Sequence, residues 1–230
     1  MNQKTDNLTG LEEILGVHFK NKNLLKTALT HKSYLNEHPK ASQEHNERLE
    51  FLGDAVLEFL VTDYLYKNFN KPEGEMTALR ASLVNSQQLA QVARILKIES
   101  YLLLSKGEQK DKGRARISIL ANALEAIIGA IYLDQGIEKT REFVKANILV
   151  HLPEIIQKGK FQDPKSRFQE IAQEKFAITP TYQTLKEWGP DHQREFLVGV
   201  YLDKKLIAKG HGFSKQEAEE EAAREALKYF

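Results

Sequence analysis

The chain has 230 residues, of which 41% are hydrophobic and 28% are charged, a composition typical of a globular protein with one or two domains. It contains no cysteine, which excludes disulfide bridges and thiolate metal sites. The formal net charge is only +1, so any binding to nucleic acid must depend on local basic patches.

Leucine and isoleucine recur at helical spacing through the first two thirds of the chain. Breaks are expected at 36–42, 70–74 and 105–113, where Asn, Gly, Pro and Ser gather. No strand pattern precedes residue 160, so an all-α domain is expected over 1–157. The spacing predicts its helices at 8–15, 22–29, 47–69, 75–83, 86–96, 117–133 and 137–149.

The expected helix at 47–69 carries an acidic face. Glu47, Glu50, Asp54 and Glu58 fall within about 80° of arc at ~3.6 residues per turn. Like charges at i,i+4 cost about 0.2–0.5 kcal/mol per pair, and Gly53 adds about 1 kcal/mol within a helix. A solvated acidic face is the ordinary interpretation of such a helix. The energetic penalties of this helix indicate instead that a positively charged group binds to its acidic face.

The expected helix at 117–133 is apolar on nearly all sides, yet it contains Asn122 and Glu125. A glutamate on a buried helix is normally paired with a basic side chain or bound to metal. Gly129, one turn after Glu125, leaves room for another helix to approach. The apolar stretch is about 15 residues long, shorter than the ~20 that a membrane span needs. We therefore expect a cytoplasmic protein with no membrane partner.

Side by side, the two helices would bring several oxygen donors together. Hard oxygen ligands select Mg²⁺ or Mn²⁺ rather than zinc. Such a site suits phosphoryl transfer. The expected donors are Glu47, Glu50, Asp54, Asn122 and Glu125.

The segment ERLEFLGD at 47–54 resembles the signature of ribonuclease III, a family of endonucleases that act on double-stranded RNA. Three further stretches support the resemblance in the right order, and it extends through nearly the whole chain. They are LLKTALTHKSY at 24–34, PEGEMTALRASLVN at 72–85 and SILANALEAIIGAIYLD at 118–134.

The resemblance implies that Glu50, Asp54 and Glu125 bind the metal ion, with Asp54 and Glu125 as the catalytic pair. It also implies a supporting acidic shell of Glu47 and Glu73. Asn122 departs from the family, which usually has an aspartate there. Its amide oxygen can still coordinate a cation, but it brings no negative charge.

By this resemblance the chain is a metal-dependent enzyme that cuts both strands of duplex RNA, leaving 5′-phosphate and 3′-hydroxyl ends on processed precursor RNAs. It also implies a homodimer, because one cluster cuts one strand and two opposed sites are needed. Phe51 is the expected anchor of the two-fold interface. The alternative is a duplex-RNA-binding protein whose catalysis is weakened by Asn122.

After a polar linker at 158–162, the pattern changes over 163–230. A helix is expected at 163–176, with Pro164 at its first position. Strands follow at 179–188, 194–202 and 205–213, and Ser214 caps a final helix at 214–230. This α-β-β-β-α order defines a small α+β domain and resembles the double-stranded RNA-binding domain.

Such a module recognises the shape of duplex RNA through two minor grooves and the phosphates between them. The resemblance places Ser166, Gln169 and Glu170 at one groove and His192 at the next. Lys215, at the start of the last helix, should meet phosphates. A second basic patch is expected in a loop at 106–118. Trp188 is expected in the core of the small domain.

Overall fold

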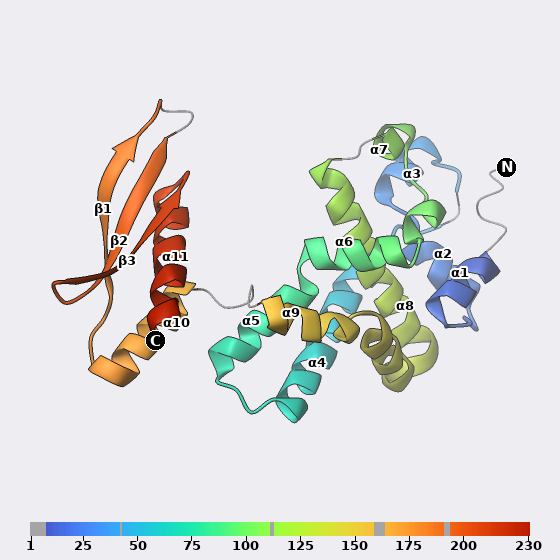
Figure 1. Cartoon of the computed structure of the whole chain (residues 1–230). Coiled ribbons are helices and arrows are strands. Elements are labelled where there is room, and N and C mark those ends of the chain that lie inside the picture. Colours follow the sequence, from blue (N-terminus) through green and yellow to red (C-terminus); the bar gives the residue numbers. More distant parts are fainter. Residues whose placement is uncertain (1–7, 42, 111–112, 159–163, 191–193) are drawn as a thin grey trace. The chain divides into compact units, whose positions relative to one another are not determined.

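The computed structural model describes residues 8–41, 43–110, 113–158, 164–190 and 194–230. The chain divides into two compact units, Met1–Phe161 and Gln162–Phe230, which are described separately (Figure 1). The expected linker at 158–162 lies almost wholly outside the described residues and stays a prediction.

The first unit is helical, as its leucine spacing predicts. Its described residues contain no strand, only an isolated bridge between Thr30 and Leu103. Three short helices that the sequence does not predict, α3, α7 and α9, join the expected ones. The elements are α1 (Leu8–Leu15), α2 (Lys22–Ala28), α3 (Lys32–Glu37), α4 (Glu47–Asn68), α5 (Glu73–Val84), α6 (Ser86–Ile95), η1 (Ile98–Tyr101), α7 (Lys106–Lys110), α8 (Arg114–Asn147), η2 (Leu149–His151) and α9 (Leu152–Lys158).

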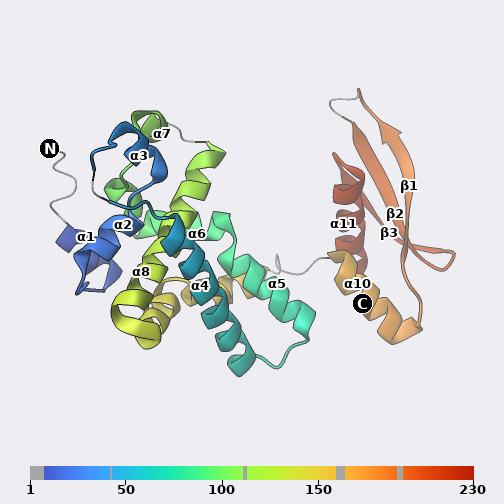
Figure 2. The same cartoon turned by 180° about the vertical axis from the view of Figure 1, so that it is seen from behind.

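Helices α4 and α8 lie side by side at the centre of this unit, with α6 crossing α8 (Figures 1 and 2). Their shared core is made of Leu, Ile and Ala side chains, including Leu57, Leu60 and Leu124, all fully or almost fully buried. Burial of this apolar surface stabilises the packing of the two helices. A kink at Gly136, with φ 80° and ψ −178°, divides α8 where the sequence predicts two helices.

One helical run among the described residues, Ala115–Gln157, is long and apolar enough to cross a membrane by composition alone. However, 61% of its apolar window is buried inside the protein. The apolar residues therefore have a place in the core of the first unit, as in the central helix of a globular domain.

The second unit has the expected α-β-β-β-α order. It consists of α10 (Pro164–Phe176), β1 (Thr181–Trp188), β2 (Glu195–Leu202), β3 (Lys205–Gly212), α11 (Lys215–Ala226) and η4 (Leu227–Tyr229). The three strands are antiparallel in the order β1-β2-β3, and one face of the sheet packs on α11 (Figure 1). Phe168, Val200 and Ala222 are fully buried between the sheet and the helices.

Candidate active site

The start of α4 is fixed by the buried residue Asn46. Its backbone N–H donates to Thr30 O at 2.9 Å, and its side-chain amide donates to Ala28 O at 3.3 Å. From this point the helix turns Leu49 and Leu60 into the core. The opposite face carries Glu50, half-buried, with Asp54 and Glu58 exposed.

Helix α8 meets this acidic face at two glycines. A Cβ atom added at Gly53 would lie 1.8 Å from the carbonyl oxygen of Glu125, and one added at Gly129 would lie 2.3 Å from Leu49 O. Only glycine permits this approach, which confirms that Gly129 makes room for a second helix. The contact brings Glu125 beside the carboxylates of α4. Its side chain is half-buried rather than fully buried, contrary to expectation.

Glu50, Asp54, Glu58 and Glu125 are here called the acidic cluster. Burial, followed by the charges of Asp54, Glu50 and Glu58, raises the pKa of Glu125 to about 8. Burial and then the charge of Glu47 also raise the pKa of Glu50, while a hydrogen bond with Asn122 opposes that rise. The four carboxylates thus lie close enough to repel one another.

Glu47 lies at the edge of the acidic cluster and is paired with a cation. Its Oε1 is 2.8 Å from Lys32 Nζ, and its Oε2 is 3.7 Å from His45 Nδ1. The hydrogen bond from Lys32 lowers the pKa of Glu47. Sequence reasoning misses this partner, because Lys32 belongs to α3, a helix of six residues that the leucine spacing does not predict.

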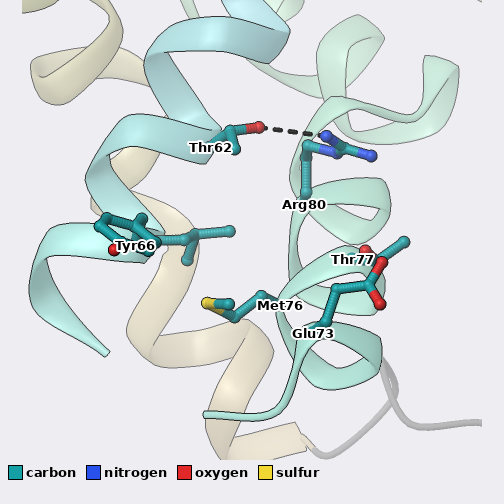
Figure 3. Close-up of a pocket in the computed structure, with 7 residues that line it drawn as sticks. Thr62, Tyr66, Glu73, Met76, Thr77 and Arg80 are labelled. Carbon is teal, nitrogen blue, oxygen red and sulfur yellow. Dashed lines mark hydrogen bonds between the residues drawn. The ribbon is translucent and has the colours of Figure 1, made fainter. Parts of the chain in front are cut away.

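Glu73 is not brought to the acidic cluster within one chain. It begins α5 and lines a pocket of about 270 Å³ with Tyr66 and Arg80 (Figure 3). Arg80 Nη1, on α5, donates to Thr62 Oγ1, on α4, at 3.1 Å, so the pocket lies between these two helices (Figure 3). Thr62 lies about 18 Å along α4 from Glu50 at ~1.5 Å per residue. In a single chain the structure therefore places Glu47, but not Glu73, beside the acidic cluster.

The donor chemistry of the acidic cluster fits a hard divalent cation. Carboxylate oxygens and the Asn122 amide are the ligands that Mg²⁺ and Mn²⁺ prefer. Burial and then the neighbouring carboxylates raise the pKa of Glu125 to about 8, and a cation would offset the part that comes from the carboxylates. No group of three Asp, Glu, His or Cys side chains within the described ranges is already arranged to hold a metal ion. The carboxylates would therefore have to close around it.

The expected basic loop at 106–118 is instead divided between two helices. Lys106 and Lys110 lie on α7, whereas Arg116 lies within α8 and pairs with Glu99 at 2.8 Å. Arg116 is 11% exposed, so little of it can meet RNA. Lys106 and Lys110 are therefore the exposed cations of the patch among those whose side chains the structure describes.

In the second unit, Ser166, Gln169 and Glu170 are exposed on one face of α10, opposite the buried Phe168. Their i, i+3, i+4 spacing presents them together, as expected for a groove contact. Glu170 also lies 3.6 Å from Arg167. His192 lies outside the described residues.

Lys215 is exposed at the first turn of α11, which Ser214 caps by accepting a hydrogen bond from Glu217 N at 3.1 Å. Its Nζ lies 5.8 Å from the ring centroid of Phe196. The next residue, Gln216, donates its side-chain amide to Glu220 at 2.9 Å. Trp188 is 36% exposed and stacks on His211, so its expected place in the core is wrong.

Comparisons with known proteins find a matching family for each of the two units. The family model described as ribonuclease-III-like matches residues 21–152, and that of the double-stranded RNA binding motif matches residues 164–230. The chain is 47% identical to the Ribonuclease 3 of Nitratiruptor over 96% of both chains. It is 44% identical to that of Borreliella burgdorferi, over 99% of this chain and 93% of the relative.

A solved structure is also similar to the first unit. The nuclease domain of ribonuclease III from Campylobacter jejuni matches with a TM-score of 0.58 and 43% identity, over 64% of this chain and 99% of that one. An acidic cluster on a helical unit, followed by a double-stranded RNA binding motif, defines an endoribonuclease of duplex RNA. The chain belongs to the ribonuclease III family. These relatives lend no support to a purely RNA-binding role.

Proposed function

We propose that this endoribonuclease requires a divalent metal ion, Mg²⁺ or Mn²⁺, and hydrolyses both strands of duplex RNA to 5′-phosphate and 3′-hydroxyl ends. The observation that carries the proposal is the close contact at Gly53 and Gly129, which sets Glu125 beside the carboxylates of α4. Burial, together with these carboxylates, raises the pKa of Glu125 to about 8. Carboxylates that repel one another at a half-buried position create a site for a positive ion.

In this proposal Glu50, Asp54 and Glu125 hold the ion. Asn122 donates its amide N–H to Glu50 and keeps its carbonyl oxygen for the cation. A bound Mg²⁺ supplies charge stabilisation at the phosphate and lowers the pKa of a water. In the hydrolysis itself, a water oxygen would bond to phosphorus while the bond from phosphorus to the 3′ oxygen breaks and a proton passes to that 3′ oxygen, which yields the two proposed ends.

The same proposal includes a homodimer, because one acidic cluster faces one strand. Phe51 is 81% exposed on α4, within the signature at 47–54, which has a large cost for an aromatic side chain unless a partner covers it. It borders a groove of about 690 Å³ together with Leu52 and Leu133. The nuclease domain of the Campylobacter jejuni relative has a structurally flexible region that is involved in dimer formation.

The second unit would position the substrate. Ser166, Gln169 and Glu170 would contact one minor groove, while Lys215 would contact phosphates at the start of α11. Phosphate contacts carry no sequence information, so this unit would select duplex shape rather than particular transcripts.

The proposal is tested by Glu125→Gln, which removes the charge and keeps the volume. We expect loss of cleavage of a long duplex in Mg²⁺, with duplex binding unchanged in a filter assay. Glu142→Gln is the matched control on α8, since Glu142 is exposed and pairs only with Lys139 among the ion pairs described. Cleavage by the wild-type protein in EDTA, or full activity of Glu125→Gln, would contradict the metal site.

A further inference from the structure

Lys32 provides a cation at the edge of the acidic cluster. It begins α3, and its side chain is 61% exposed while its Nζ lies 2.8 Å from Glu47 Oε1. Because the side chain is exposed, no packing requirement fixes it in this place. Its contact with Glu47 is the interaction that explains its position.

Glu47 is engaged on both oxygens. One faces Lys32, and the other lies 3.7 Å from His45 Nδ1, a buried atom with no hydrogen-bond partner among the described residues. The carboxylate is therefore turned toward α3 and the segment before α4. It nevertheless stands one helical turn from Glu50 and within electrostatic range of it.

A released Glu47 would change the acidic cluster. Its side chain is 47% exposed, which leaves it room to turn toward Glu50 once the ammonium group of Lys32 is gone. A cation bound by the cluster would attract it, since a carboxylate is a better ligand for Mg²⁺ than a neutral amide. The ligand set would then contain one carboxylate more than Glu50, Asp54 and Glu125.

We propose that Lys32 is a positioning residue for the cleavage reaction: it holds Glu47 at the edge of the cluster and keeps this carboxylate out of the metal ligand set. The inference rests on the proposed metal-dependent function. Lys32 acts through Glu47 and does not itself touch the ion.

The test uses Lys32→Met and the matched control Lys67→Met. Lys67 lies on α4, is 63% exposed and pairs with Asp63 at 2.8 Å, almost the geometry of the Lys32 pair. Mn²⁺ binding to the RNA-free protein is measured by the EPR signal of free Mn²⁺, and kcat and KM are measured on a duplex at saturating Mg²⁺. Lys32→Arg retains the charge and serves as the conservative variant.

We expect Lys32→Met to bind Mn²⁺ about tenfold more tightly, because a positive charge near the cluster is removed and Glu47 is released to bind the ion. Its kcat should fall about tenfold, since a misplaced ligand carries a penalty of up to ~10²-fold, while KM stays unchanged. Adding Glu47→Gln to Lys32→Met should restore kcat, because the intruding carboxylate is removed. Lys32→Arg and Lys67→Met should behave as the wild type.

Three results would overturn the inference. Lys32→Met could match Lys67→Met in Mn²⁺ affinity and kcat, or it could raise KM alone, which would make Lys32 an RNA phosphate contact. The double variant could also be no more active than Lys32→Met. A separate result would contradict the proposed metal-dependent function itself. In that case the wild type would bind Mn²⁺ no better than Glu125→Gln, and the inference about Lys32 would be wrong as well.

Discussion

Gly53 on α4 lies directly against the backbone of Glu125 on α8, so closely that a Cβ atom would stand 1.8 Å from the carbonyl oxygen. Gly53→Ala must therefore push the two helices apart. We expect the free energy of unfolding to fall by about 1–3 kcal/mol, as in other overpacked cores. Cleavage should fall further, because the carboxylates of the two helices separate. Thermal unfolding and a duplex cleavage assay measure the two effects.

The matched control is Gly74→Ala in α5, where an added Cβ meets no described atom within 4 Å. Alanine in a helix is better than glycine by about 0.5–1 kcal/mol, so this variant should be slightly more stable and fully active. If both substitutions proved equally harmless, the close contact between α4 and α8 would be wrong.

Asn122→Asp adds a carboxylate beside Glu50 and removes the amide hydrogen bond that opposes the rise in the pKa of Glu50. The metal-free protein should become less stable, because one more negative charge enters the acidic cluster. The Mg²⁺ concentration for half-maximal cleavage should fall, because the cation gains a charged ligand. A titration of cleavage rate against Mg²⁺ checks this. A higher midpoint would mean that the asparagine itself is the adapted ligand.

The acidic cluster predicts a pH dependence of stability in the absence of metal. The pKa of Glu125 is raised from 4.5 to about 8, so the folded protein keeps a proton that the unfolded chain releases. The contribution of this group to stability is complete below pH 4.5 and is lost as pH rises toward 8. Chemical denaturation of wild type and Glu125→Gln at several pH values, in EDTA, measures the difference. A difference that does not vary between those pH values would contradict the assigned repulsion.

Phe51→Ala should weaken dimerisation, because an aromatic anchor at the centre of an interface contributes about 2 kcal/mol or more. Tyr66→Ala is the matched control, since Tyr66 is 77% exposed on the same helix, away from the groove beside Phe51. Sedimentation should show a larger monomer fraction for Phe51→Ala only, together with fewer paired cuts in duplex RNA. A wild-type monomer that still makes paired cuts would exclude the dimer.

In the second unit, Lys215→Ala should weaken binding to unrelated duplexes by the same factor. The slope of log affinity against log salt should decrease in magnitude by about 0.7–0.9 for one lost phosphate contact. Gln216→Lys should have the opposite effect, because it adds a cation beside the N-terminus of α11. A change in cleavage positions without a change in the salt slope would show sequence reading instead.

The sequence predicts the parts of the fold that depend on long periodic patterns. The helices α4 and α8, the glycine contact at Gly129 and the α-β-β-β-α order are all confirmed. Short helices are missed, because six residues such as Lys32–Glu37 show too few turns for a period to appear. The side-chain type of Trp188 predicts a place in the core, whereas this residue ends β1 with its ring partly exposed.

The same limit applies to the site. Spacing along one helix correctly groups Glu50 and Asp54, but it contains no information on Lys32, whose pairing with Glu47 arises only when α3 folds against the start of α4. Glu73 illustrates the reverse case. It belongs to the stretch at 72–85 that supports the family resemblance, yet the length of α4 separates it from the acidic cluster in a single chain.

The pairing of α4 with α8 also has a consequence for the order of events during synthesis. The two helices begin at Glu47 and Arg114, so the ribosome has released all of α4 before Glu125 is made. Closing such a loop has an entropic cost that only the completed helix–helix contact offsets. Until then, the nascent chain carries only the carboxylates of α4. The acidic cluster, and with it the ability to cut RNA, is complete only after α8 has left the ribosome and packed against α4.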